Sequence, residues 1–203
     1  PHHWLKELEL NARPFVEQVP AMRNLSHLDE SECIARAQRG DVSAFSELVS
    51  RFQDRIYRFL VRLTRSQDDA RDLTQETFLR AFQSLPRWAP DARFTTWLFR
   101  IARNLAFDLL RRHKRVEFVA LEEDASIVDT AQGPDDVLQT AQRLRLLEAA
   151  LLRLPAEHRE ILLLREIEDM TYDDIADVLG LNLGTVKSRI ARARSALIAA
   201  TTR

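Results

Sequence analysis

The sequence predicts an all-α protein: two small helical bundles joined by a flexible acidic linker, the second containing a helix-turn-helix. Three observations support this fold class. Apolar residues recur at three- and four-residue steps along most of the chain, which is the period of an amphipathic helix. The 203 residues include only 4 glycines, and glycine is the residue that weakens a helix most after proline. No segment alternates apolar and polar residues convincingly, as a half-buried strand would.

Composition excludes several classes of protein. No stretch approaches the roughly 20 apolar residues that a membrane helix needs, so we expect no membrane insertion. The single cysteine, Cys33, cannot form an internal disulfide, and residues 1–24 contain no export signal. We therefore expect a cytoplasmic protein. The five histidines are scattered without ligand spacing, so we expect neither a metal site nor a cofactor.

The net charge of −1 conceals an uneven distribution. Residues 99–115 carry six basic residues and one acidic residue, and residues 182–203 carry five basic residues and no acidic one. Between them, residues 116–142 carry seven acidic residues and no basic one. This pattern predicts two cationic surfaces separated by an acidic connector.

Residues 1–28 form an N-terminal extension. Trp4, Leu5 and Leu8 can form one face of a short helix, but Pro14 and Pro20 interrupt the pattern. A disordered tail and a docked extension are both compatible with this segment.

Capping signals define the first three helices. Asp29 with Glu32 predicts a helix start, and Gly40 predicts its end. A second helix begins near Asp41, and Ser66 caps a third. The residues expected to be buried on the second and third helices are Phe45, Leu48, Val49, Phe52, Ile56, Phe59, Leu60 and Leu63, and Ala70, Leu73, Phe78, Leu79 and Phe82.

A loop over 84–93 follows, with Trp88 in its middle, and leads to a fourth helix over about 95–113. Trp97 shares the four-residue repeat of this helix, which favours a place in the core over a surface role. The repeat consists of Trp97, Ile101, Leu105 and Leu109. The first bundle is thus expected over 29–115.

The acidic linker is expected over 116–136 and contains Gly133 and Pro134, which terminate regular structure. It is either a solvated tether or a mimic of nucleic acid in a basic channel. The second bundle is expected over 137–203, with helices near 137–153, 156–167, 171–179 and 185–200.

The strongest motif is the helix-turn-helix over 171–194. Thr171 caps its first helix with Asp174, and Gly180 relaxes the turn. The inner face of that helix is expected to be Ile175, Ala176 and Leu179, and Val186 and Ile190 are expected to anchor the second helix.

The second helix of the motif is expected to contact DNA. It starts with short side chains, so its backbone amides can approach a phosphate. It carries no acidic residue, so its lysine and arginine side chains can enter a major groove. Any amphipathic arginine-rich helix shares part of this pattern, and Arg194 and Arg203 are compatible with simple solvated charges. Lys187, Ser188 and Arg192 are the predicted base contacts.

With these residues in place, the chain resembles the extracytoplasmic-function (group IV) sigma factors of bacterial RNA polymerase, in the sigma-70 family. The resemblance covers roughly residues 29–200. It implies a factor that binds core polymerase and directs promoter-specific initiation. The matching blocks are 40–49 (GDVSAFSELV), 69–82 (DARDLTQETFLRAF), 94–112 (FTTWLFRIARNLAFDLLRR), 154–163 and the helix-turn-helix.

The resemblance assigns roles to three sets of residues. The clamp of the largest polymerase subunit is expected to contact Asp72, Gln75, Glu76 and Arg80. Unpaired minus-ten DNA is expected to contact Trp88, Arg100, Arg103, Asn104, Asp108, Arg111 and Arg112. Minus-thirty-five duplex is expected to contact Arg165, Tyr172 and Thr185 through its backbone, and Lys187, Ser188 and Arg192 through its bases.

The resemblance also implies an anti-sigma factor as a partner, and a binding function without catalysis. One rival is a helix-turn-helix regulator that binds operators as a homodimer; it has no need of the 69–82 and 94–112 blocks. The other rival is an enzyme, but the sequence holds no glycine-rich phosphate loop, metal cluster or usable Cys/His pair.

Overall fold

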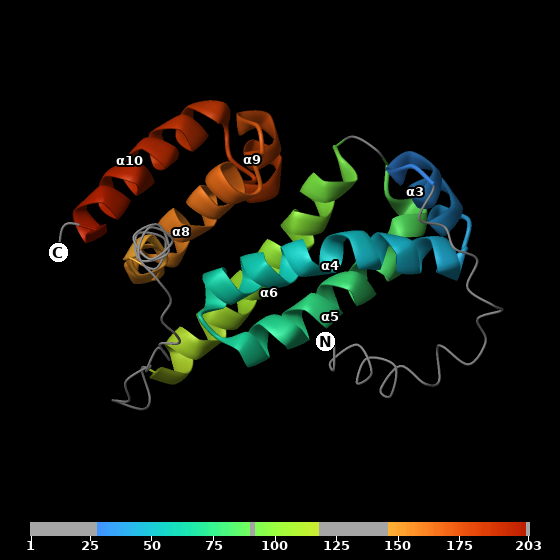
Figure 1. Ribbon diagram of the computed structural model, residues 1–203, viewed down its shortest axis with the longest axis horizontal. Coiled ribbons are helices and arrows are strands. Elements are labelled where there is room, and N and C mark those ends of the chain that lie inside the picture. Colours follow the sequence, from blue (N-terminus) through green and yellow to red (C-terminus); the bar gives the residue numbers. More distant parts are fainter. Residues whose placement is uncertain (1–27, 90–91, 118–145, 202–203) are drawn as a thin grey trace, which may run out of the picture. The chain divides into compact units, whose positions relative to one another are not determined.

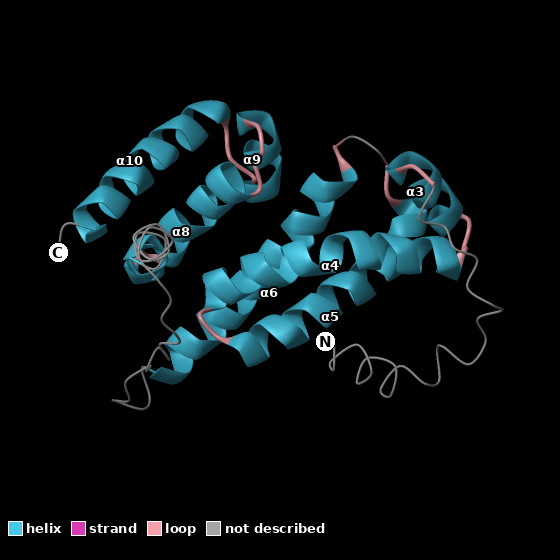
Figure 2. Ribbon diagram, in the orientation of Figure 1, coloured by secondary structure: helices cyan, strands magenta, loops and turns pink. Residues whose placement is uncertain are grey.

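The computed structural model describes residues 28–89, 92–117 and 146–201. The predicted N-terminal extension up to residue 27, and the predicted linker from residue 118 onward, lie outside these ranges. Every regular element within them is helical (Figure 2), which confirms the all-α prediction. None of the described helices has the length and apolar character needed to cross a bilayer.

The helices follow one another in the order labelled in Figure 1, with a further helical stretch over 146–153. Their bounds lie close to those expected from capping residues and periodicity. The elements are α3 (Glu30–Gln38), α4 (Val42–Thr64), α5 (Gln67–Ser84), η1 (Leu85–Arg87), α6 (Phe94–Glu117), α8 (Ala156–Leu162), η2 (Leu163–Ile167), α9 (Tyr172–Leu179) and α10 (Leu183–Thr201).

The chain packs as two compact units, and α4 and α5 contribute residues to both. One unit consists of the residues up to Phe52 together with Phe82–Trp88. The other consists of Gln53–Ala81 and Ala89–Arg203.

In the first unit, α3 is fixed at both ends. The Asp29 carboxylate accepts the Glu32 amide at 2.7 Å, as predicted, and Gly40 ends the helix with φ +92°. Cys33 is fully buried on α3, and burial raises the pKa of its thiol. The Phe45 and Phe82 rings pack edge to face with centroids 5.0 Å apart.

In the second unit, α4, α5 and α6 build one part of the core, and α8, η2, α9 and α10 build another. Phe59 and Phe99 pack edge to face with centroids 5.2 Å apart. Trp97 is buried, as its helical register predicts. The fully buried large side chains on α4 and α6 of this unit are Ile56, Phe59, Leu60, Leu63, Leu98 and Phe99, and those on the later helices are Ile161, Leu163, Leu164 and Ile175.

The prediction that Leu79 is buried is wrong, because 51% of this side chain is exposed. The buried residues of α5 recur at three- and four-residue steps, with Phe78 beside this series; the series is Ala70, Leu73, Thr77 and Ala81. Leu79 lies about 100° further around the helix than Phe78, which turns it away from this face. Val49 and Phe82 are half-buried rather than buried.

The predicted helix over 156–167 contains a feature that periodicity does not show. After α8 the backbone widens into a π-helical turn, η2, in which the Glu168 amide donates to the Leu163 carbonyl at 3.0 Å. A π-turn accommodates one extra residue within a helix. Met170, which follows it, donates its amide to the Leu164 carbonyl at 3.1 Å.

Arg159 on α8 is a buried cation that the sequence pattern does not reveal. Its side chain is 3% exposed and donates to the carbonyls of Leu63, Leu152 and Leu154 at 3.0, 2.8 and 3.3 Å. Burial lowers the pKa of Arg159 to about 10. Because buried carbonyls need donors, this guanidinium satisfies three carbonyls from two chain segments at once.

Candidate nucleic-acid interface

The helix-turn-helix forms as its capping signals predict. The Thr171 hydroxyl accepts the Asp174 amide at 3.1 Å, and the Asp174 carboxylate accepts the Thr171 amide at 3.2 Å, which completes a capping box. Gly180 ends α9 in the left-handed conformation with φ +64°. The Asn182 side chain then accepts the Thr185 amide at 2.8 Å and caps α10.

The helix α10 has a buried face and an exposed face. Val186, Ile190 and Ala193 are buried, and the first two confirm the predicted anchors. The three predicted base contacts, Lys187, Ser188 and Arg192, are all exposed. The Arg192 Nε donates to the Ser188 carbonyl at 3.4 Å, so these two residues lie one turn apart on the same face.

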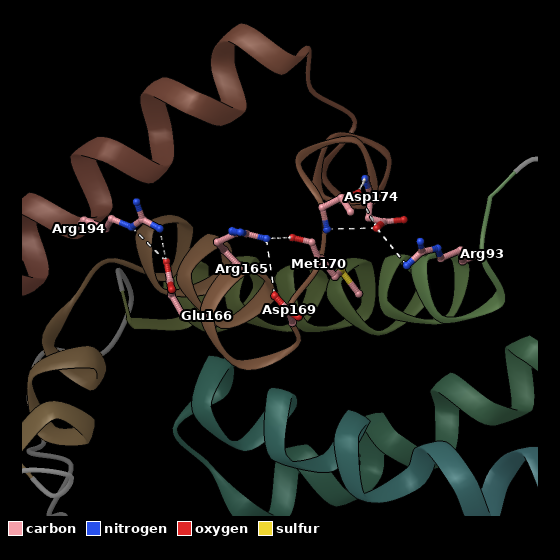
Figure 3. A network of polar contacts seen from close by, with 8 residues as sticks. Arg93, Arg165, Glu166, Asp169, Met170, Asp174 and Arg194 are labelled. Atoms are coloured by element: carbon pink, nitrogen blue, oxygen red, sulfur yellow. Dashed lines mark hydrogen bonds and ion pairs between the residues drawn. The ribbon is translucent and has the colours of Figure 1, made fainter.

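Of the three predicted backbone contacts, Tyr172 and Thr185 lie in the first turns of α9 and α10, and Arg165 lies in η2, before the motif. The Arg165 guanidinium lies over the Tyr172 ring at 5.3 Å. It also donates to the Met170 carbonyl at 2.6 Å (Figure 3). Arg165 and Tyr172 are thus a stacked pair. Thr185 lies in the first turn of α10, and its amide is occupied by Asn182.

Arg194, which was compatible with a solvated charge, is instead paired. Its guanidinium donates to the Glu166 carboxylate at 2.7 Å, and so joins α10 to η2 (Figure 3). Arg194 is therefore an exposed side chain paired with a residue of η2, whereas the exposed Arg192 has no such ion pair among the described residues.

Asp174 joins this motif to α6. Its carboxylate accepts the Thr96 hydroxyl at 2.9 Å. The same carboxylate lies 3.8 Å from the Arg93 guanidinium (Figure 3). Burial raises the pKa of Asp174, but the hydrogen bonds from Thr171 and Thr96 and the charge of Arg93 outweigh it. The pKa therefore lies below its ordinary value.

We expect Asp174→Asn to lower the free energy of unfolding by about 1–2 kcal/mol at pH 7, the scale of a lost helix cap. Because the folded pKa of Asp174 is depressed, its contribution is present above pH 3.8 and is lost as the pH falls through the folded pKa. The difference in free energy of unfolding between the original protein and Asp174→Asn, measured by urea denaturation, must therefore shrink from pH 7 to pH 3. Asp173→Asn, at the neighbouring exposed residue, is the control; an equal loss there contradicts the assignment.

The predicted minus-ten residues divide into exposed and engaged side chains. Arg100, Asn104 and Arg112 are exposed on α6, and Trp88 is half-buried directly after η1. Arg111 pairs with Asp108 one turn earlier on the same helix, so that this pair presents little net charge.

Arg103 is engaged by a carboxylate that the sequence does not single out. Its guanidinium donates to Glu160 of α8 at 2.8 Å and lies over the Phe107 ring at 4.3 Å. Glu160 is fully buried, and Arg189 of α10 lies 3.9 Å from it. Burial raises the pKa of Glu160 despite the two neighbouring arginines. This carboxylate is shared by a basic side chain from each cationic segment.

The predicted polymerase-binding residues lie on one outward side of α5. Asp72, Gln75 and Arg80 are exposed, and Glu76 is half-buried. The Arg80 guanidinium donates to the Glu76 carboxylate at 2.7 Å. The exposed Leu79 lies among these polar residues, so this surface combines charge with an apolar side chain.

Glu160 and Thr96 are the site residues that sequence reasoning missed. Both owe their role to partners more than fifty residues away in the chain, and no local spacing encodes such pairs. Within the described parts of the chain, no cluster of three or more His, Cys, Asp or Glu side chains is placed to hold a metal ion.

Two family models match the chain. The model described as Sigma-70 region 2 matches residues 48–116, and the model described as Sigma-70, region 4 matches residues 144–197. The ECF RNA polymerase sigma factor SigW of Bacillus subtilis is 30% identical over 172 residues, which cover 81% of the chain and 92% of the relative. The chain belongs to the ECF sigma factors.

Further matches agree with this family. The ECF RNA polymerase sigma factor SigE of Mycolicibacterium smegmatis is 40% identical over 164 residues; the match covers 80% of this ECF factor and 63% of that relative's length. Among solved structures, the sigma factor RpoE in complex with the anti-sigma factor NepR from Bartonella quintana matches with a TM-score of 0.63 and 26% identity over 78% of this chain and 96% of that chain. CnrH in complex with the cytosolic domain of CnrY matches with a TM-score of 0.62 and 28% identity, over 83% and 94%.

Proposed function

We propose that this ECF factor binds core RNA polymerase and directs initiation at specific promoters. The observation that carries the proposal is the exposed surface of α10. Lys187, Ser188 and Arg192 lie exposed on a helix whose other face is anchored by Val186 and Ile190. A rigid helix with exposed hydrogen-bond donors fits a major groove, where such donors distinguish base pairs.

The two predicted bundles divide the recognition of a promoter. Residues 29–115 bind polymerase and the unpaired minus-ten element, and residues 137–203 bind minus-thirty-five duplex. The acidic segment 116–136 links them, and residues 1–28 precede them. Arg100 and Arg112 neutralise phosphates, which contributes affinity without sequence information, while Trp88 offers a ring on which an unpaired base can stack.

The protein acts by binding and not by catalysis, in the compartment that holds polymerase and chromosome, the cytoplasm. An anti-sigma factor is its expected regulator, because the similar RpoE was solved with the anti-sigma factor NepR. Such a partner keeps the factor from polymerase until a signal releases it.

In vitro transcription tests the proposal. The purified chain is mixed with bacterial core polymerase and a library of genomic promoter fragments, and transcript starts are mapped by sequencing. We expect new starts that require the chain and share two sequence elements upstream. Core enzyme that gives the same transcripts with and without the chain contradicts the proposal.

The homodimeric regulator makes the opposite prediction. Such a protein protects duplex operators as a dimer in the absence of polymerase, and adds no transcript to core enzyme. Footprinting with and without core polymerase therefore separates the two functions in one experiment.

Replacing Glu76 by alanine is expected to weaken binding to core polymerase by about 1–2 kcal/mol, the loss typical of the minority of interface residues that carry most of the binding energy. The change also removes the Arg80 pair, which is too exposed to stabilise the fold much. Binding is measured by titrating labelled chain with core enzyme. Asp54→Ala removes an exposed carboxylate from α4 instead and should leave the affinity unchanged; equal affinities for both variants contradict the polymerase-binding surface.

A further inference from the structure

We propose that Gln38, the last residue of α3, is a positioning residue that fixes Trp88 for stacking on an unpaired promoter base. The Gln38 side-chain amide donates to the carbonyl of Trp88 at 2.8 Å and to the carbonyl of Leu85 at 3.3 Å. The inference rests on the proposed role of Trp88 in minus-ten recognition. Gln38 lies outside the segment matched by the region 2 model, which begins at residue 48.

The turn that carries Trp88 has little regular structure to hold it. It consists of the three-residue 3-10 helix η1, closed by one hydrogen bond from the Trp88 amide to the Leu85 carbonyl at 3.1 Å. Short 3-10 helices have poor hydrogen-bond geometry and are used only in short pieces. The backbone after Trp88 turns into an extended conformation, with ψ 123°, so its carbonyl leaves the helical pattern.

Gln38 supplies a donor to the Trp88 carbonyl and a second donor to the Leu85 carbonyl, which also accepts the Trp88 amide. Its amide reaches the carbonyls at the start and at the end of the turn, at residues 85 and 88. One side chain therefore fixes both the closure of the turn and the direction in which the chain leaves it. Leu85 is 1% exposed, so the turn is anchored by its apolar side chain and by Gln38 together.

The helix that bears Gln38 is itself held firmly within the same unit. Cys33 and Ala37 are buried on α3. The Arg51 guanidinium of α4 donates to the Leu28 carbonyl at 2.7 Å, just before the Asp29 cap. Gln38 can restrict the motion of Trp88 only if α3 is itself rigid, because a mobile helix would move together with the turn.

Fixing Trp88 matters because stacking on a flipped base is opposed by the entropy of ordering the ring. A turn that already holds the ring lowers this cost before the DNA arrives. The net free energy of one hydrogen bond corresponds to about a fivefold change in an equilibrium constant. We therefore expect Gln38→Met, which keeps the length of the side chain and removes its donor, to weaken binding to unpaired minus-ten DNA by about three- to tenfold.

The experiment is a double-mutant cycle in the holoenzyme. Gln38→Met, Trp88→Ala and the double variant are assembled with core polymerase at saturating concentration. Dissociation constants are measured for two probes of a promoter mapped by transcription: a fork with the minus-ten bases unpaired, and a duplex ending upstream of them. Gln67→Met makes the same change at an exposed residue at the opposite end of α5, and serves as the control.

A positioning role predicts a loss on the fork probe alone, and no further loss from Gln38→Met once Trp88 is alanine. A merely structural role predicts equal losses on both probes, which persist in the Trp88→Ala background. An unchanged affinity of Gln38→Met for the fork, with Trp88→Ala impaired, overturns the inference and leaves the function of Trp88 standing. An unimpaired Trp88→Ala overturns the role of Trp88 and the inference with it.

Discussion

Replacing Ile190 by alanine is expected to lower the free energy of unfolding of the C-terminal helices by about 2–5 kcal/mol, the range for truncating a buried aliphatic side chain. Ile190 is 2% exposed on the inner face of α10. Its removal leaves a cavity where α10 packs against α8 and α9. The same change should abolish minus-thirty-five binding near the growth temperature, because the exposed face of α10 is fixed only while its inner face is packed.

The measurement is urea denaturation of the full chain followed by circular dichroism, and the control lies on the same helix. Ile198 is 67% exposed, so Ile198→Ala removes the same atoms from a surface position and should change stability by less than about 0.5 kcal/mol. Equal midpoints for the two variants would show that Ile190 does not anchor the helix.

The second large effect is expected at Arg192. We expect Arg192→Ala to reduce discrimination between the cognate minus-thirty-five element and a single-base variant by about 1–3 kcal/mol, the scale of one good base contact. Arg192 is exposed, and its only described hydrogen bond is the long one to the Ser188 carbonyl. Competition binding of the holoenzyme to the two promoters measures this difference.

Arg194→Ala provides a control of equal charge two residues further on. Its guanidinium is committed to Glu166, so its loss should lower the affinity for both promoters by the same factor. Loss of discrimination in Arg194→Ala, with Arg192→Ala unaffected, would exchange the roles of the two arginines.

Most of the fold can be predicted from local sequence signals. Asp29, Ser66 and Thr171 begin helices because their side chains accept amides of the first turn, and each was predicted from a short polar residue before an apolar repeat. The buried face of α4 follows from its long three- and four-residue repeat. The π-turn η2 was not foreseen, since its apolar residues continue the same repeat through the extra residue.

The site is harder to predict from the sequence, because several of its contacts join distant parts of the chain. Exposure of Lys187, Ser188 and Arg192 follows from the period of α10 once Val186 and Ile190 are assigned to the core. The pairing of Arg103 with Glu160, or of Thr96 with Asp174, depends on how distant helices pack. Leu79 shows that a prediction can also fail within one helix. An apolar residue next to a buried face is predicted to be buried because it is apolar, although its angular position around the helix turns it outward.

The carboxylate shared by Arg103 and Arg189 ties three helices to one buried charge. Glu160 on α8 is fully buried, and its two counter-charges come from α6 and α10. A buried carboxylate without a counter-charge is costly, because burial alone favours its neutral form. The packing of the two cationic segments against α8 is therefore electrostatically coupled, since loss of either arginine leaves the other to neutralise Glu160 alone.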